Sequence, residues 1–372
     1  MRVAIPSEVK DNEFRVAITP AGVGELVGRG HEVFVQSGAG VGSLFSDGDY
    51  VAQGAEVLGS AEEVWGVGEL VVKVKEPVER EYGFLRDDLV LFTYLHLAAD
   101  RAQTDALLGA GTTAVAYETV ELPGRVLPLL YPMSEVAGCL APQVGAGYLL
   151  RPAGGRGVLM GCIGGVRPAK VVVLGCGTAG LNAVNVALGM GADVTVLDTD
   201  LGKLRSAFWR FGGRVRGLAS SALAVREEVL GADLVVGTVL VPGARAPKLV
   251  TNEMVSLMKP GSVLVDVAID QGGCFEDSRP TTHADPVFRV HDSVFYCVAN
   301  MPGAVPSTST WALTNATLPY VCALADKGWR AALRDDRGLA LGLNTWQGKV
   351  TCAGVGQAFP DLPAADLDEA LA

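Results

Sequence analysis

The chain has 372 residues, of which 49% are hydrophobic and only 19% are charged. This balance is typical of sheets covered on both faces by helices, and the length predicts two domains, each with its own core. The net charge of −11 and the lack of a basic cluster exclude nucleic acid as an expected partner, because phosphate backbones repel an acidic surface.

The first 127 residues have the pattern of an alternating α/β unit. Arg2–Ile5 is a predicted strand, and Thr19 is the expected N-cap of a helix that starts at Pro20 and runs to Gly30. The glycines in 38–42 follow a strand but lack G-x-G-x-x-G spacing, so this segment is interpreted as a loop. The other predicted elements are the strands His31–Gln36, Leu70–Val74, Leu89–Leu95 and Thr112–Tyr117 and the helix Arg101–Leu108.

Prolines at 123, 128 and 132 separate this unit from the next. A helix is expected to begin near Ser134, with Ser134 as its N-cap, and to continue towards Leu150. Past Pro306 the pattern is helical again, most clearly over Thr310–Leu324, and this segment is expected to return to the first domain. The predicted domains are therefore 1–127 with 307–372, and 128–306.

The most informative stretch lies in the second domain. A short apolar strand, Val171–Leu174, precedes Gly175, Gly177 and Gly180, and an apolar helical pattern follows. The first glycine permits a sharp turn, the second lets a pyrophosphate approach bare backbone, and the third lets the helix pack close to the strand. Asp198 ends the next predicted strand at the distance expected for an acid that binds the ribose 2′-hydroxyl, so NAD is predicted over NADP.

No charged residue lies between Lys170 and Asp193, which is a length that could span a membrane. The internal glycines and two asparagines favour a buried strand, turn and helix instead, so no membrane association is expected. The amino terminus lacks the apolar core and cleavage site of a secretory signal. Seven scattered cysteines without a C-x-x-C pair predict a cytoplasmic chain with free, mostly buried thiols.

Later strands of the second domain are predicted at Leu234–Val241, Ser262–Val267 and Val294–Val298. The loops that follow such strands are where ligands bind in a doubly wound sheet. The predicted fold class is therefore α/β, with two Rossmann-like doubly wound domains and a cleft between them. No cluster has metal-ligand spacing, so no metal is expected.

Two candidate catalytic side chains follow strands of the first domain. His96 comes after an apolar strand and can exchange protons near neutral pH, although it could equally be a hydrogen-bonded structural histidine. Strand alternation places Lys73 and Lys75 on one face, which makes Lys75 either a substrate ligand or half of a solvated pair.

Two further candidates lie in loops. Arg15 could bind a carboxylate with two hydrogen bonds, or form a surface salt bridge with Glu8 or Glu13. Asp270 follows an apolar strand of the nucleotide domain, where it either faces a ligand or caps the turn before the glycine pair 272–273.

Several long motifs resemble the bacterial L-alanine dehydrogenase family over roughly residues 1–350, and the related nicotinamide nucleotide transhydrogenase α subunit shares that fold. The motifs are PSEVKDNEFRVAITPAGV (6–23), LLYPMSEVAG (129–138), the glycine turn, DVAIDQGGCFE (266–276), VANMPGAVPSTST (298–310) and ALTNATLPY (312–320). The resemblance implies reversible, NAD-dependent oxidative deamination of L-alanine to pyruvate and ammonia. It also implies a homohexamer.

The resemblance assigns roles to residues at matching positions. Arg15 and Lys75 would hold the substrate, His96 would be the acid and base, and Asp270 would help to activate water. The cofactor-binding residues it implies are Ser134, Gly175, Gly177, Thr178, Ala179, Gly180, Asp198, Lys203, Ser220, Val239, Leu240, Val267 and Asn300.

Several features depart from the family pattern, among them Ala4, where glycine is usual, and the loop Met160–Val166, which lacks a common proline. Cys176 replaces a small residue inside the glycine turn, and Cys139 and Ser307 stand where arginine is common. These departures leave open a paralogue that acts on another small L-amino acid. A transhydrogenase-type subunit and a non-catalytic NAD-binding protein are also compatible with the sequence.

Overall fold

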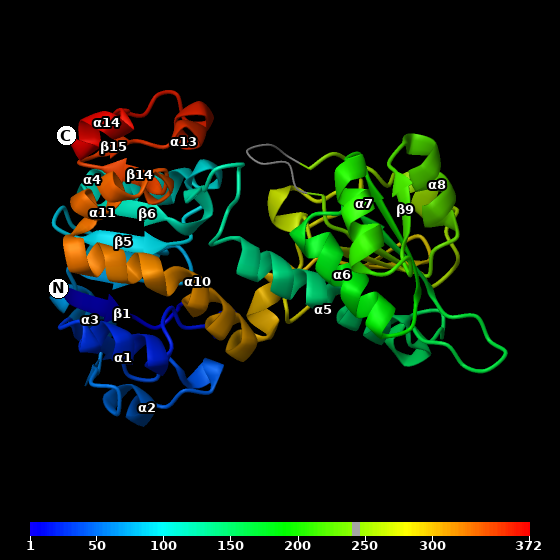
Figure 1. The fold of residues 1–372 in the computed structure, drawn as a ribbon, viewed down its shortest axis with the longest axis horizontal. Helices are drawn as coiled ribbons and strands as arrows, with labels where there is room; N and C mark the ends of the chain where they lie inside the picture. The colour runs from blue at the N-terminus through cyan, green and yellow to red at the C-terminus, as the bar shows by residue number, and fades with distance from the viewer. Residues whose placement is uncertain (240–245) are drawn as a thin grey trace. The chain divides into compact units, whose positions relative to one another are not determined.

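The computed structural model describes residues 1–239 and 246–372. It divides into two compact units (Figure 1). Unit 1 comprises Met1–Met133 and Val305–Ala372, and unit 2 comprises Ser134–Ala304. Each unit contains one strand-rich sheet with helices packed against it, so the predicted α/β class with two Rossmann-like units is confirmed.

Unit 1 is built on an eight-stranded sheet with the order β15-β14-β6-β5-β4-β1-β2-β3. Its first six strands in the chain pair in parallel, and the C-terminal hairpin adds β14 and β15 by antiparallel pairing. The strands are β1 (Arg2–Ile5), β2 (Glu32–Gln36), β3 (Glu56–Leu58), β4 (Leu70–Val72), β5 (Val90–Thr93), β6 (Thr113–Ala116), β14 (Leu343–Trp346) and β15 (Lys349–Val350).

Helices bury both faces of this sheet because its central strands β1, β4, β5 and β6 are mostly apolar on both sides. Ala4, Val71 and Leu91 share one core cluster with α3, α4 and α13, whereas α1 and α10 pack together at Gly22 and Thr314. The helices of unit 1 are α1 (Pro20–Gly28), α2 (Asp47–Val51), α3 (Ala61–Val67), α4 (Arg101–Ala110), α10 (Pro306–Lys327), α11 (Trp329–Asp335), α12 (Arg337–Ala340), α13 (Ala353–Ala358) and α14 (Leu367–Leu371).

Unit 2 is built on a seven-stranded sheet with the order β12-β13-β11-β10-β7-β8-β9, in which only β12 is antiparallel to its neighbour among the described strands. The direction of winding reverses between β7 and β10, which is the switch point where doubly wound sheets bind ligands. The strands are β7 (Lys170–Leu174), β8 (Asp193–Asp198), β9 (Arg216–Ala219), β10 (Leu234–Gly237), β11 (Val263–Asp266), β12 (Val287–Val290) and β13 (Ser293–Tyr296).

The helices of unit 2 also divide between the two faces of its sheet. Val172, Val235 and Leu264 form a cluster with α8 and α9, while α5 and α6 cross closely at Gly138 (Figure 1). A Cβ atom at Gly138 would lie 2.2 Å from the carbonyl oxygen of Ala179, so this crossing requires glycine. The helices are α5 (Tyr131–Leu149), which begins in unit 1, α6 (Thr178–Gly189), α7 (Leu201–Arg210), α8 (Ala222–Leu230) and α9 (Asn252–Ser256).

Local signals predicted some element ends and missed others. The strand at Arg2–Ile5 is confirmed, and so is the Thr19 cap, whose side chain accepts from the Gly22 N–H at 3.3 Å. The N-cap role of Ser134 is wrong, because α5 already begins at Tyr131 and Ser134 lies within its first turn. The segment 38–42 is a turn leading into a short 3₁₀ helix, as expected of a loop.

All seven cysteines are free thiols, and four of them are buried. The predicted free, mostly buried thiols are therefore confirmed. Among the residues that the structure describes, no helix combines the length and apolarity needed to cross a membrane.

Candidate functional site

The predicted site residues of unit 1 follow the carboxyl ends of neighbouring strands. Arg15 lies in the loop after β1, Lys75 follows β4, and His96 follows β5. These strands are adjacent and parallel, so the three segments lie along one edge of the sheet.

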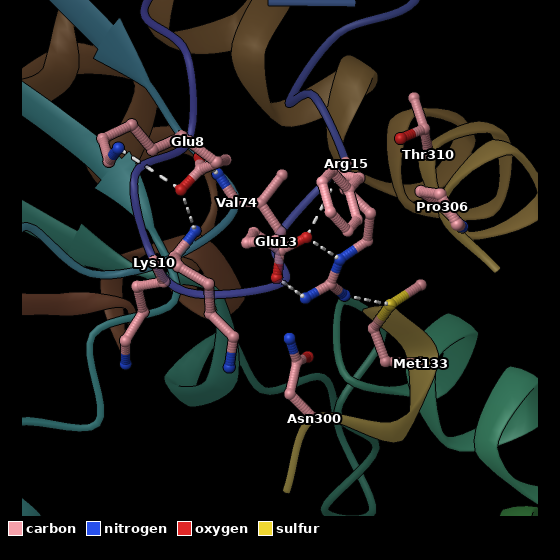
Figure 2. Close-up of polar contacts among 12 residues, drawn as sticks. Glu8, Lys10, Glu13, Arg15, Val74, Met133, Asn300, Pro306 and Thr310 are labelled. Carbon is pink, nitrogen blue, oxygen red and sulfur yellow. Dashed lines mark hydrogen bonds and ion pairs between the residues drawn. The ribbon is translucent and has the colours of Figure 1, made fainter. Parts of the chain in front are cut away.

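Arg15 is 2% exposed and pairs with Glu13 (Figure 2). The Glu13 carboxylate accepts from Nε of Arg15 at 2.7 Å and from its Nη2 at 2.5 Å, while Nη1 lies 3.0 Å from the sulfur of Met133. An ion pair with Glu13 was one of the two roles expected from the sequence, but the pair is buried rather than on the surface. Two hydrogen bonds to one carboxylate fix the plane of the guanidinium group.

A cavity of about 290 Å³ adjoins this ion pair. Burial would lower the pKa of Arg15, but the hydrogen bonds and charge of Glu13 outweigh it and the pKa is raised. The guanidinium group therefore stays charged beside the cavity. The lining residues are Ser7, Glu8, Val9, Lys10, Asn12, Glu13, Phe14, Arg15, Gly38, Ala39, Gly42 and Arg80.

Lys73 is fully buried and lies between two carboxylates. Its Nζ is 2.9 Å from Glu81 and 3.3 Å from Glu8. The prediction that Lys73 and Lys75 share one strand face is wrong, because β4 ends at Val72 and strand alternation stops there. Lys73 instead belongs to a buried ion cluster, defined here as Glu8, Lys73 and Glu81.

The buried ion cluster also holds the backbone that carries Lys75. Glu8 accepts from the Val74 N–H at 2.6 Å and from the Lys75 N–H at 3.4 Å (Figure 2 shows Glu8 beside Val74). On the other side, the Thr93 hydroxyl donates to the Lys75 carbonyl at 3.0 Å. Lys75 is thus positioned from both sides, although it lies outside any strand.

Charge balance sets the protonation of the cluster. Burial would lower the pKa of Lys73, yet the charges of Glu8 and Glu81 raise it above its usual value. Burial raises the pKa of Glu8. The charge of Lys73 opposes the rise that burial gives to the pKa of Glu8.

His96 stands in the left-handed region, with φ 52° and ψ 36°, and its side chain is 47% exposed. Its ring stacks on Tyr94, with centroids 5.8 Å apart and an interplanar angle of 7°. Glu118 accepts from the His96 N–H at 2.6 Å and lies 4.0 Å from Nδ1. Glu118 holds the His96 backbone, while the imidazole ring is partly exposed. This arrangement fits an acid and base better than a hydrogen-bonded structural histidine.

In unit 2 the glycine turn lies at the switch point and packs on β10. The Thr238 hydroxyl donates to the carbonyls of Leu174 and Gly175 at 2.9 and 3.0 Å. Gly175 has φ +101°, and a Cβ atom at Gly180 would lie 1.9 Å from the Gly175 carbonyl oxygen. The first and third glycines are therefore required by the conformation and by the close packing, as the motif predicts.

The middle of the turn fits a phosphate group. Gly177 is the N-cap of α6, and within the described chain no side chain caps this helix end. Apart from Gly177 and its two chain neighbours, no described atom lies within 4 Å of where a Gly177 Cβ would stand. The 12-residue helix begins with Thr178 and Ala179, and the N–H groups of its first turn have no partner within the helix. Backbone donors and the helix dipole favour an anion there.

Asp198 ends β8 next to this turn. Its carboxylate accepts from the Cys176 N–H at 2.7 Å and from the Asp200 N–H at 2.8 Å. These bonds fix the carboxylate at the sheet edge, where each oxygen retains a second lone pair for a ribose hydroxyl. Cys176 is buried in the turn, and burial raises its pKa to about 11, so it is an uncharged packing residue.

The remaining cofactor candidates follow the carboxyl ends of successive strands in unit 2. Along the sheet edge they run Asn300 after β13, Val267 after β11, Val239 after β10, the glycine turn after β7, Asp198 at the end of β8 and Ser220 after β9. These candidates therefore share one edge of the unit 2 sheet.

Two other candidates lie on helices. Lys203 is exposed in the first turn of α7, and Ser134 is half-buried in the first turn of α5. Leu240 lies outside the described residues.

Asp270 is exposed in a 3₁₀ turn, Ile269–Gln271, four residues after β11. The Gly272 N–H donates to the carbonyl of Ile269, and the Gly273 N–H donates to that of Ala268. Backbone carbonyls, and not the Asp270 side chain, therefore close the turn, so the turn-capping role is wrong.

Sequence reasoning missed three supporting side chains: Glu118, Thr238 and Asp266. Each one binds the backbone of a predicted site residue or its loop. Glu13 was named as a possible partner because it lies two residues from Arg15, whereas the other three gave no local signal. Within residues 1–239 and 246–372 no group of three or more His, Cys, Asp or Glu side chains could hold a metal ion.

Comparison with known proteins identifies similar chains along the whole length. The N-terminal domain family of alanine dehydrogenase/PNT matches residues 4–137, and the C-terminal domain family matches residues 141–353. An alanine dehydrogenase of Mycolicibacterium smegmatis is 61% identical over 372 residues, which are 100% of both chains. An alanine dehydrogenase of Mycobacterium tuberculosis is 63% identical over 348 residues, 94% of each chain.

Solved structures give the same grouping. An L-alanine dehydrogenase matches with a TM-score of 0.94 at 50% identity, over 97% of this chain and 99% of that one. A transhydrogenase from Sinorhizobium meliloti matches with a TM-score of 0.81 at 28% identity, over 95% and 99% of the two chains. The sequence is thus considerably more similar to the first structure than to the second.

Proposed function

The chain belongs to the alanine dehydrogenase/PNT family, and on that premise we propose that it catalyses the NAD-dependent oxidative deamination of L-alanine to pyruvate and ammonia, and the reverse reaction. The observation that carries this proposal is the 61% identity, over the full length of both chains, to an alanine dehydrogenase. The positions of Arg15, Lys75 and His96 along one edge of the unit 1 sheet support it.

Arg15 and Lys75 bind the substrate in this proposal. Glu13 fixes the plane of the Arg15 guanidinium, and Glu8 and Thr93 fix the backbone of Lys75. Two cations held in this way orient the substrate carboxylate and carbonyl, and orientation is a large part of catalysis in a hydride-transfer enzyme.

His96 and Asp270 handle protons. NAD, when bound, accepts a hydride from C2 of the amino acid. His96 or Asp270 then takes the proton from the water that attacks the resulting iminium, and returns a proton as ammonia leaves the carbinolamine. Both side chains are exposed in their own units.

Unit 2 holds the cofactor in this proposal. The backbone at Gly175, Gly177, Thr178, Ala179 and Gly180 would hold the pyrophosphate, which fits the open space at the start of α6. Asp198 would bind the ribose and disfavour a 2′-phosphate, hence NAD rather than NADP. Ser134, Lys203, Ser220, Val239, Leu240, Val267 and Asn300 would make the other contacts.

Two further expectations come with the family. We propose a homohexamer, supported by the resemblance alone, which size measurement in solution would test. A cytoplasmic location is supported by seven free thiols, since a reducing compartment keeps thiols unpaired.

The proposal is tested by measuring NADH absorbance with NAD and, in turn, L-alanine, L-serine, glycine and L-2-aminobutyrate. We expect L-alanine to give the highest kcat/KM. A preference for another amino acid would instead identify a paralogue, in which the departures at Cys139, Cys176 and Ser307 are the first positions to revert. NAD binding without turnover of any amino acid would overturn the proposal and favour a transhydrogenase-type or non-catalytic protein.

A further inference from the structure

Asp266 is the last residue of β11 and is fully buried, with 0% exposure. It comes four residues before Asp270, but its side chain is enclosed by the protein, whereas Asp270 is exposed. A buried carboxylate is costly unless its oxygens are hydrogen-bonded, so its partners indicate why the chain keeps it there.

The carboxylate of Asp266 accepts from both ends of the loop that carries Asp270. Oδ1 accepts from the Ala268 N–H at 3.1 Å, before the 3₁₀ turn. Oδ2 accepts from the N–H groups of Cys274 and Phe275 at 2.9 and 3.4 Å, after the turn, and from the Ser278 hydroxyl at 2.5 Å. One side chain thus ties residue 268 to residues 274–278.

The fit around this carboxylate is close. Gly273 has φ +71°, and a Cβ atom there would lie 2.6 Å from Oδ2 of Asp266. The Cys274 thiol adds a contact of 3.6 Å to Oδ1. From another direction, Lys248 donates to the carbonyls of Gly272 and Phe275 at 2.6 and 2.8 Å. The loop is therefore fixed through its backbone on both sides of Asp270.

Only a carboxylate can accept all of these bonds. The donors named above are uncharged N–H, O–H and S–H groups that reach both oxygens, and a carboxylate is an acceptor at each of them. An asparagine of the same shape would turn its NH₂ group towards one set of donors and lose those bonds. Burial raises the pKa of Asp266, and the Ser278 hydroxyl and the three N–H groups act against that rise.

We propose that Asp266 is a positioning residue for the reaction: its carboxylate sets the conformation of the 268–274 loop and so the place of Asp270. This inference rests on the proposed function of Asp270 and goes beyond it, because Asp266 itself touches no reacting group. Its effect is on the chemical step, since the contacts assigned to substrate binding belong to unit 1.

The test compares Asp266→Asn with Asp233→Asn in the full-length protein. Asp233 is a matched control, because it is a buried aspartate of the same sheet at the opposite strand ends, where it accepts from the Lys170 N–H and pairs with Lys259 and Arg156. We expect Asp266→Asn to lower kcat for L-alanine by about 10²-fold, while KM for L-alanine changes by less than about threefold. Asp233→Asn should leave both constants unchanged.

Hydrogen exchange supplies a readout that does not depend on turnover. The amides of Ala268, Cys274 and Phe275 should exchange faster in Asp266→Asn but at the native rate in Asp233→Asn. If Asp266→Asn does not fold, Ser278→Ala replaces it, with faster exchange at the same amides and a smaller loss of kcat.

Native exchange at these amides in the variant would overturn the proposal, as would native kcat with faster exchange. A native protein that turns over no amino acid would show that the proposed function has failed, whereas faster exchange in the variant would then still support the role of Asp266 in fixing the loop.

Discussion

Replacing His96 with asparagine should lower kcat/KM for L-alanine by about 10²–10⁴-fold, the usual contribution of a positioned acid and base. Asparagine is the appropriate substitution because His96 has φ 52°, and asparagine tolerates the left-handed region better than alanine does. The Glu118 bond to the backbone N–H at 96 should therefore survive, so that only the imidazole is lost.

The control for this variant is His291→Asn. His291 also has positive φ, at 49°, but it lies in a surface turn of unit 2 and contacts Asn252. NAD affinity, measured by fluorescence titration, should be native in both variants, since the glycine turn is unchanged. An equal loss of activity in the two variants, or native activity in His96→Asn, would remove His96 from the mechanism.

Replacing Lys73 with methionine should lower the free energy of unfolding by about 3–5 kcal/mol at pH 8, measured by urea denaturation. Lys73 is the cation of the buried ion cluster, so its removal leaves Glu8 and Glu81 facing each other without compensation. An exposed pair provides the control: Lys349→Met removes a contact with Glu369 at the surface and should have no measurable effect.

The pH dependence identifies the charge as the cause. Burial already raises the pKa of Glu8 in the native protein, and without Lys73 the folded-state pKa rises further above the usual 4.5 of the unfolded chain. Because the pKa of Glu8 is higher in the folded than in the unfolded chain, its contribution to the free energy of unfolding is fully present below pH 4.5. That contribution is lost as the pH rises through the folded-state pKa. The free energy of unfolding that Lys73→Met loses relative to the native protein should therefore be smaller at pH 5 than at pH 8. An equal loss at both values would indicate lost packing instead.

The elements that carry local signals were predictable from sequence. Glycine spacing predicted the turn at Gly175–Gly180 because backbone conformation and close approach demand glycine there. Thr19 before Pro20 predicted the start of α1 for a similar reason, since capping involves only neighbouring residues.

Features that depend on distant partners were not predictable. β14 joins the sheet by pairing with β6, from which it is far removed in sequence, and no local pattern indicates that partner. Lys73 and Lys75 do not share a strand face because β4 ends at Val72, and the backbone beyond it is held by Glu8, which is far away in sequence. The role of Asp266 was hidden for a different reason: its donors are near in sequence but become its neighbours only when the loop folds back.

The most direct test of the central claim is the fate of the C2 hydrogen. The native protein is incubated with NAD and L-alanine deuterated at C2, and the products are examined by NMR and mass spectrometry. The proposed reaction predicts one deuterium at C4 of the reduced nicotinamide, with pyruvate and ammonia formed in equal amounts. Reduced nicotinamide without deuterium, or no reduction despite bound NAD, would contradict hydride transfer from L-alanine and with it the proposed function.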